Sequence, residues 1–223
     1  SPEEIELFLM EVCKIFKNVN VDLMYGLPGQ NPMNVRKDID TLKTFNVTHT
    51  SYYQLTIEPG TNFYSNTPKL PSEDVIWDMY SLIMNELARN GYSRYEVSAY
   101  SRDGMRCQHN MNYWEFGDYI GIGAGAHSKI TKNHTMERRI VISNPINYVE
   151  KIQSNNQYFK KTSYLPGADI LFEYILNASR LTRGFKILDF EERTGLKFSN
   201  EQGKFCLAYD KGLIKITLDK VIP

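Results

Sequence analysis

Apolar side chains recur at helical spacing at the start of the chain and then give way to an apolar run. Residues 3–17 place apolar side chains three or four positions apart, which predicts an amphipathic helix. An apolar run over 19–25 ends at Gly26, so we expect a buried strand there. Helical spacing returns over 33–45, and a second strand is expected over 48–57, where Glu58-Pro59-Gly60 closes it. This order predicts a parallel β–α–β unit.

The middle of the chain combines regular elements with one long aromatic segment. The expected elements are a helix over 72–90, a strand over 92–100, an aromatic loop over 102–119, a strand over 135–143 and a helix over 145–154. A serine followed by two acidic residues caps the first helix, and a glycine ends it. Both strands alternate between apolar and polar positions, which is typical of strands buried on one face.

A polar segment over 155–167 resembles a linker and precedes a change of pattern. Helical patterns follow over 168–181, 186–194 and 200–211, and strand-like alternation follows over 212–221. Three short helices and a strand predict a small winged-helix-like domain at the end of the chain.

Charge and composition exclude several classes of function. The 223 residues carry 26 basic and 26 acidic side chains, whereas a nucleic-acid-binding protein usually carries a basic excess, so the balance argues against nucleic acid as the main partner and leaves only a local basic patch as the alternative. No apolar run approaches the roughly 20 residues that span a bilayer. Cys13, Cys107 and Cys206 are odd in number and lack the spacing of a metal motif, which favours a reducing compartment. We therefore expect a cytoplasmic protein with neither a nucleic-acid partner nor a transmembrane segment.

The segment over 102–128 combines large apolar rings with amides and imidazoles. It contains the pattern H-N-x-x-Y-W, whose residues are His109, Asn110, Tyr113 and Trp114. Because loops normally expose few aromatic side chains, this segment either folds down as local core or lines a slot for a flat ligand. A haem would suit these residue types, since imidazole can ligate iron and rings can pack on the macrocycle. The cations available for its propionates are Arg102, Arg106 and Lys129.

Other candidate residues lie near glycines and strand ends. The glycines of G-I-G-A-G-A-H (121–127) lack the dinucleotide-binding spacing, so we interpret them as sites of close backbone approach, with cofactor contact as the alternative. Asp22 lies in an apolar strand, where a carboxylate is costly unless it is paired. Gln54 and Thr56 hold a similar place on the next strand and could face a ligand. The histidines are too scattered to predict a metal cluster: His49, His109, His127 and His134.

Four stretches, taken in this order, carry a family resemblance. They are V-D-L-M-Y-G-L-P-G-Q (21–30), S-Y-Y-Q-L-T-I-E-P-G-T (51–61), Y-E-V-S-A-Y-S-R-D-G-M-R-C-Q-H-N-M-N-Y-W (95–114) and G-D-Y-I-G-I-G-A-G-A-H-S (117–128). The chain resembles the radical-SAM haem chaperones of the HemW family, close relatives of oxygen-independent coproporphyrinogen III oxidase. The resemblance covers nearly the whole chain and is weakest after about residue 165.

This resemblance implies an α/β fold in two domains. Residues 1–160 would be the C-terminal part of a partial (β/α)6 radical-SAM barrel with an added α+β segment, and residues 165–223 the winged-helix-like domain. The haem-contacting residues implied by the motif are His109, Asn110, Tyr113 and Trp114. The same resemblance implies that Asp22 and Thr56 contact S-adenosylmethionine.

The family's C-x-x-x-C-x-x-C motif, which ligates a [4Fe–4S] cluster, is absent from this sequence. We therefore expect a C-terminal portion that lacks the cluster-binding half and is not active alone. The implied function is to bind haem and deliver it to apo-haemoproteins, with membrane contact only through a recipient. The alternative is coproporphyrinogen III oxidation, the oxidative decarboxylation that yields protoporphyrinogen IX. A third possibility is that the last domain serves as a protein-interaction module.

Overall fold

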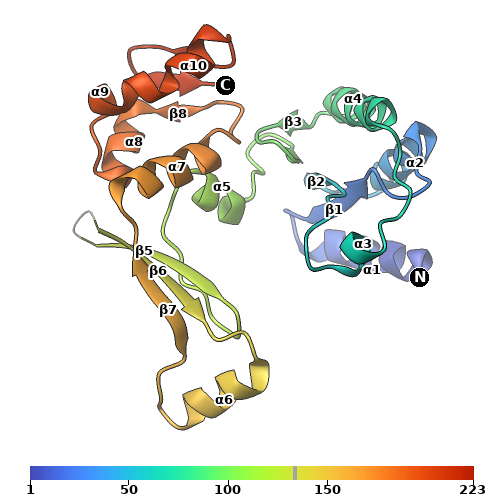
Figure 1. The fold of residues 1–223 in the computed structure, drawn as a ribbon. Helices are drawn as coiled ribbons and strands as arrows, with labels where there is room; N and C mark the ends of the chain where they lie inside the picture. The colour runs from blue at the N-terminus through green and yellow to red at the C-terminus, as the bar shows by residue number, and fades with distance from the viewer. Residues whose placement is uncertain (133–134) are drawn as a thin grey trace. The chain divides into compact units, whose positions relative to one another are not determined.

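The computed structural model describes residues 1–132 and 135–223. They fold as two compact units, Ser1–Cys107 and Gln108–Pro223, each with its own hydrophobic core (Figure 1). Within the described residues, no helix is long and apolar enough to cross a membrane.

A four-stranded sheet forms the centre of the first unit. The elements are α1 (Pro2–Ile15), β1 (Asn20–Tyr25), α2 (Pro32–Leu42), β2 (His49–Gln54), α3 (Asn62–Ser65), α4 (Glu73–Arg89), β3 (Ser93–Arg94) and β4 (Ala99–Ser101). The strand order is β1-β2-β4-β3. β1 and β2 are parallel, which confirms the predicted β–α–β unit, and β4 is antiparallel to both of its neighbours.

One face of this sheet packs against α2 and α4. Successive side chains of a strand point to opposite faces, so β1 turns Val21, Leu23 and Tyr25 toward the core. The two helices contribute buried apolar side chains at helical spacing: Val35, Ile39, Leu42, Met79, Ile83 and Leu87. Helix α1, in contrast, buries none of its residues.

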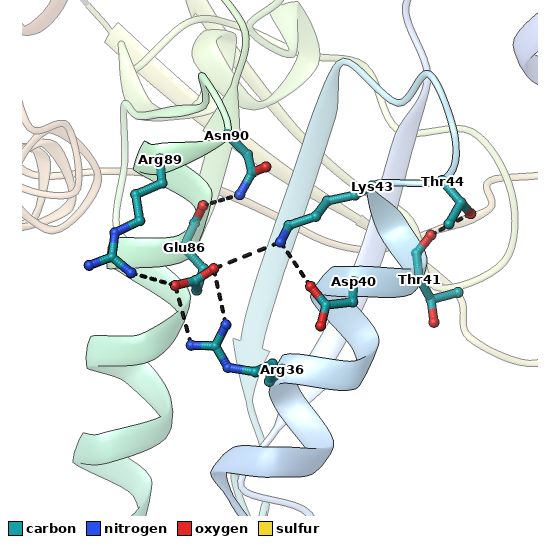
Figure 2. Close-up of polar contacts among 8 residues, drawn as sticks. All are labelled: Arg36, Asp40, Thr41, Lys43, Thr44, Glu86, Arg89 and Asn90. Atoms are coloured by element: carbon teal, nitrogen blue, oxygen red, sulfur yellow. Dashed lines mark hydrogen bonds and ion pairs between the residues drawn. The ribbon is translucent and has the colours of Figure 1, made fainter.

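A buried carboxylate joins the two covering helices (Figure 2). The Glu86 side chain of α4 is only 8% exposed and accepts hydrogen bonds from Arg36 of α2 at 3.2 Å and from Arg89 at 2.8 Å. Lys43 lies 3.8 Å from Glu86 and 2.8 Å from Asp40. The hydrogen bond from Arg36 and then that from Arg89 hold the pKa of Glu86 below its usual range. Glu86 therefore ties α2 to α4 while keeping its charge.

The second unit contains two antiparallel three-stranded sheets. Its elements are α5 (Gln108–Trp114), β5 (His127–Lys132), β6 (Thr135–Val141), α6 (Pro145–Gln153), β7 (Phe159–Tyr164), α7 (Gly167–Ala178), β8 (Phe185–Lys186), α8 (Ile187–Thr194), α9 (Phe198–Glu201), a 3-10 turn (Gln202–Phe205), α10 (Cys206–Asp210), β9 (Lys215–Ile216) and β10 (Lys220–Ile222). The strand orders are β5-β6-β7 and β8-β10-β9. Figure 1 shows α6 at the end of the first sheet that lies away from α7 and α8.

An aromatic cluster forms the core of the second unit. Tyr174 of α7 is 1% exposed and meets Phe116, Phe185 and Phe190 edge-on at 5.0 to 5.4 Å between ring centroids. Such edge-to-face pairs add to the free energy of burial. Because Phe116 lies two residues after the end of α5, this core also fixes the C-terminal end of that helix.

Several predicted elements differ from those observed. The expected loop over 102–119 contains α5, and the expected linker over 155–167 contains β7. The single strand expected over 92–100 is two short strands, and the helix expected over 200–211 is broken into α9, the 3-10 turn and α10. β7 reads F-K-K-T-S-Y and has little apolar pattern, so its pairing with β6 decides its conformation.

The compact units divide the chain between Cys107 and Gln108, whereas the predicted domains divide it near residue 160. Phe116 and Met136 share one core with α7 and α8, so residues before the predicted division pack with those after it. The division into 1–160 and 165–223 remains a prediction.

Candidate functional site

The H-N-x-x-Y-W motif lies on α5, which begins one residue before it. Residues four apart share one side of a helix, so His109 pairs with Tyr113, and Asn110 pairs with Trp114 on the adjacent side. The motif therefore presents two neighbouring surfaces. The structure brings His109 and Tyr113 into contact, with ring centroids 4.9 Å apart and the planes at 72°.

The first surface is a row of three rings: His109, Tyr113 and Tyr119. Tyr113 lies 4.6 Å from Tyr119, so it is packed between that ring and the imidazole. At the outer end His109 is exposed, and neither of its nitrogens makes a hydrogen bond to the described residues. At the inner end the Tyr119 hydroxyl accepts a hydrogen bond from Arg138 of β6. The row thus presents an accessible imidazole on a fixed aromatic base.

Trp114 lies on the second surface and packs inward. The guanidinium of Arg180 stands 4.3 Å from the centroid of its ring, and its indole Nε1 is buried without a hydrogen-bond partner among the described residues. Trp114 also lines a pocket of about 240 Å³, which is smaller than the roughly 300–1,000 Å³ of typical ligand sites. Side chains of both charges surround this pocket, including Arg183, Asp189 and Arg193. It is too small to enclose a macrocycle.

Lys129, which we expected to be available for a propionate, is committed inside the protein. Its side chain is 3% exposed, and Nζ donates to the Phe116 carbonyl at 2.9 Å and to Asp118 at 3.1 Å. Burial lowers the pKa of Lys129, and the bond to Asp118 opposes that effect. Burial raises the pKa of Asp118, but hydrogen bonds from Thr131 and Lys129 outweigh it and hold the pKa below its usual range. Lys129 therefore fixes the turn after α5, which corrects the expectation.

The other two cations named for propionates lie over rings of the first unit. The guanidinium of Arg102 is 5.3 Å from the centroid of Tyr92, and that of Arg106 is 5.8 Å from Tyr95.

The glycine-rich segment after Tyr119 permits close approach of two backbones. A Cβ at Gly121 would lie 2.2 Å from the carbonyl oxygen of His127, which no side chain allows. The interpretation of close approach is confirmed at this position. The backbone N–H of Gly121 also donates a hydrogen bond to the Ser128 hydroxyl oxygen at 2.9 Å.

Asp22 and Thr56 belong to the first unit, whereas the H-N-x-x-Y-W motif belongs to the second. Asp22 lies in mid-strand opposite Ser51 and is exposed, because it alternates with the core-facing residues of β1. The expectation of a buried carboxylate was therefore wrong, and Asp22 accepts a hydrogen bond from Asn20 at 2.8 Å. Thr56 follows the end of β2 and is exposed, with its hydroxyl 3.4 Å from the Gln54 carbonyl.

The sequence did not predict that Tyr119 and Arg138 belong to the site. Tyr119 belongs to the aromatic segment, but nothing in the sequence shows that it adjoins Tyr113. Arg138 lies 19 residues further on, and only the pairing of β5 with β6 brings it to Tyr119. The available signal was that Arg138 lies two positions from both Met136 and Ile140, and therefore on the same side of the predicted strand as these apolar residues.

No metal-binding group is formed by the side chains at 1–132 and 135–223. The three cysteines are free thiols, and His134 lies outside the described residues.

Comparison with known sequences finds relatives of this chain among the heme chaperones named HemW. The chain is 40% identical to the heme chaperone HemW of Buchnera aphidicola (subsp. Schizaphis graminum) over 98% of its own length and 57% of that protein. It is 39% identical to the heme chaperone HemW of Escherichia coli K12 over 81% of its length and 47% of that protein. This chain is a homologue of the HemW proteins. It spans about half the length of these HemW relatives.

Comparison with solved structures finds a protein that shares the fold of this chain. Coproporphyrinogen III oxidase (HemN) from Escherichia coli, described as a radical SAM enzyme, matches with a TM-score of 0.78 at 17% identity. The match covers 100% of this HemW homologue and 55% of HemN, so the mixed α/β fold is shared. No protein-family model matches the chain.

Proposed function

We propose that this chain forms the haem-binding part of a haem chaperone, in which the imidazole of His109 ligates the haem iron. The observation that carries the proposal is an exposed imidazole without a hydrogen-bond partner in the described chain, held on the ring of Tyr113. A neutral imidazole nitrogen is a common ligand of haem iron. The residues present therefore fit the group, and the HemW name of the relatives supports the same ligand.

The other motif residues take different roles in this proposal. Tyr113 supports the imidazole and offers an apolar ring edge to the macrocycle. Asn110 and Trp114 lie on the adjacent side of α5, where the stacking of Trp114 on Arg180 anchors the helix. The Asn110 amide and the part of the Trp114 indole that remains exposed would contact the rim of a bound haem, while the buried Nε1 side of the indole stays packed in the unit. Bound haem would then pass to a recipient apo-haemoprotein.

Haem titration of the whole chain tests the role of His109. We expect His109→Ala to weaken haem binding by at least about tenfold and to shift the Soret band, since an iron ligand is lost. His127→Ala is the matched control, because His127 is another exposed histidine of the same unit. It should change the affinity less than about twofold. Unchanged affinity in His109→Ala would overturn the proposal.

The proposal also assigns each part of the chain to a known type of domain. The β1-α2-β2 unit would be part of a partial (β/α)6 radical-SAM barrel, and α7 to β10 a winged-helix-like domain. The fold shared with HemN supports a barrel origin. S-adenosylmethionine and a [4Fe–4S] cluster would belong to the full-length protein, with Asp22 and Thr56 offering a carboxylate and a hydroxyl to the former. Weaker S-adenosylmethionine binding in full-length Asp22→Asn protein would support this assignment, and unchanged binding would remove it.

Coproporphyrinogen III oxidation would contradict the chaperone assignment. The HemN comparison carries the fold alone, whereas the sequence relatives carry the HemW name. We therefore expect the full-length protein to bind haem without converting coproporphyrinogen III to protoporphyrinogen IX. Turnover detected by porphyrin fluorescence after oxidation of the products would favour the oxidase.

A further inference from the structure

Arg138 holds the inner end of the ring row in two ways. Its guanidinium lies 5.8 Å from the centroid of the Tyr119 ring, and Nη1 donates a hydrogen bond to the Tyr119 hydroxyl. Nη2 forms an ion pair with Glu173 of α7. Both partners of this pair are largely buried, with side chains 22% and 25% exposed. A planar guanidinium suits this combination of stacking and directed hydrogen bonds.

The surroundings show why Arg138 needs Glu173. Arg138 lies opposite Lys129 in the register of β5 and β6, so two cations stand side by side on one sheet face. Asp118 neutralises Lys129, and Glu173 neutralises Arg138. The charge of Arg138 is therefore satisfied within the unit, which leaves it free to fix Tyr119 rather than to bind a ligand anion.

Helix α5 depends on such external support. It has only seven residues, and isolated helices of that length are unstable in water because nucleation is costly. Its C-terminal end is fixed by Phe116 in the core, and its outward rings are fixed by contact with Tyr119. The orientation of His109, in the first turn, therefore depends on the chain of contacts through Tyr113 and Tyr119.

We propose that Arg138 is a positioning residue for His109, acting through Tyr119 and Tyr113. This inference rests on the proposed role of His109 in haem binding. Loss of Arg138 would release the Tyr119 ring, and Tyr113 would lose the surface that holds it against the imidazole. A haem bound by His109 would then meet a ligand of variable orientation, so both affinity and the iron–imidazole geometry would change.

The neighbouring arginine provides a matched control. Arg139 follows Arg138 on β6 and points to the opposite sheet face. It has the same two kinds of contact, an ion pair with Glu137 at 2.5 Å and a stack 5.4 Å from the centroid of Phe159. Arg139 touches no ring of the His109 row among the described contacts. Both Arg138→Gln and Arg139→Gln remove one ion pair and one ring contact, but Arg138→Gln also removes the hydrogen bond to Tyr119, and only the contacts of Arg138 support the row.

Haem titration and resonance Raman spectra of the whole chain test the proposal. We expect Arg138→Gln to weaken haem binding by about three- to tenfold and to broaden or shift the iron–histidine stretching band of the ferrous complex. Arg139→Gln should change neither. Arg138→Lys should fail to rescue, because an ammonium cannot stack and donate in two directions at once. Equal behaviour of the two glutamine variants would overturn the proposal.

A second variant keeps the test decisive if Arg138→Gln does not fold. Tyr119→Phe removes the hydroxyl that accepts from Arg138 and retains the ring and all charges. It should shift the same Raman band, and an unaltered band would contradict the relay. The His109→Ala variant separates the two hypotheses. If it binds haem normally, the proposed function fails; if it loses haem while Arg138→Gln matches Arg139→Gln, only the positioning role fails.

Discussion

Substitution of Gly184 by alanine tests whether close backbone approach holds the C-terminal hairpin against the second core. A Cβ at Gly184 would lie 1.9 Å from the carbonyl oxygen of Val221, so that oxygen must move about 1.5 Å to reach an ordinary contact of 3.4 Å. Val221 is 2% exposed and pairs with β8 and β9. Displacing it would cost about 2 kcal/mol of apolar burial and about 1 kcal/mol of hydrogen bonding.

Gly212 is the matched control for backbone strain. Both glycines have positive φ, 64° at Gly184 and 66° at Gly212, but a Cβ at Gly212 meets nothing within 4 Å. The strain common to both substitutions is about 1 kcal/mol. We therefore expect Gly184→Ala to lower the free energy of unfolding by about 4 kcal/mol and Gly212→Ala by about 1 kcal/mol.

Thermal unfolding measured by tryptophan fluorescence separates the two outcomes. The chain has two tryptophans, one in each unit, so a Trp77→Phe background leaves Trp114 as the reporter of the second unit. At about 4 °C per kcal/mol, the midpoint should fall by about 16 °C in Gly184→Ala and by about 4 °C in Gly212→Ala. Midpoints that agree within about 2 °C would refute the argument that the approach to Val221 matters.

Three further predictions concern charged and titratable groups. Burial lowers the pKa of His49, and the nearby Asp22 opposes this effect. The contribution of His49 to the free energy of unfolding is therefore complete above about pH 6.5 and declines as the pH falls below that value. Urea unfolding at several pH values should show a weaker decline in His49→Gln than in the unsubstituted chain. Lys129→Met should lower the free energy of unfolding by about 1–3 kcal/mol in chemical denaturation, because the Phe116 carbonyl loses its partner. Glu86→Gln should lower the urea midpoint at neutral pH, and the difference from the unsubstituted chain should shrink as the pH falls through the lowered pKa of Glu86; a difference independent of pH would contradict this.

In the first unit, the pattern of apolar and polar residues predicted most helices and strands but not the exposure of every side chain. The pattern of the sequence predicted β1, α2, β2 and α4, because the two helices and β1 carry a single core-facing side and all four elements have clear ends. The same pattern misplaced Asp22, because the exposed face of β1 carries the apolar Met24 beside Asn20 and Asp22, so the strand resembles one that is buried on both faces. Only the pairing of β1 with β2 shows which side chains face the helices.

For the candidate site, the sequence by itself determined the motif and its residue types, including His109, and the likeness to haem chaperones. Tertiary structure decided how those residues are arranged. It turned an expected loop into α5, separated Trp114 from the His109 row, committed Lys129 to the core and brought Arg138 to Tyr119. The physical reason is that α5 is too short to be stable alone, and its support comes from strands distant in sequence, whose pairing no local pattern encodes.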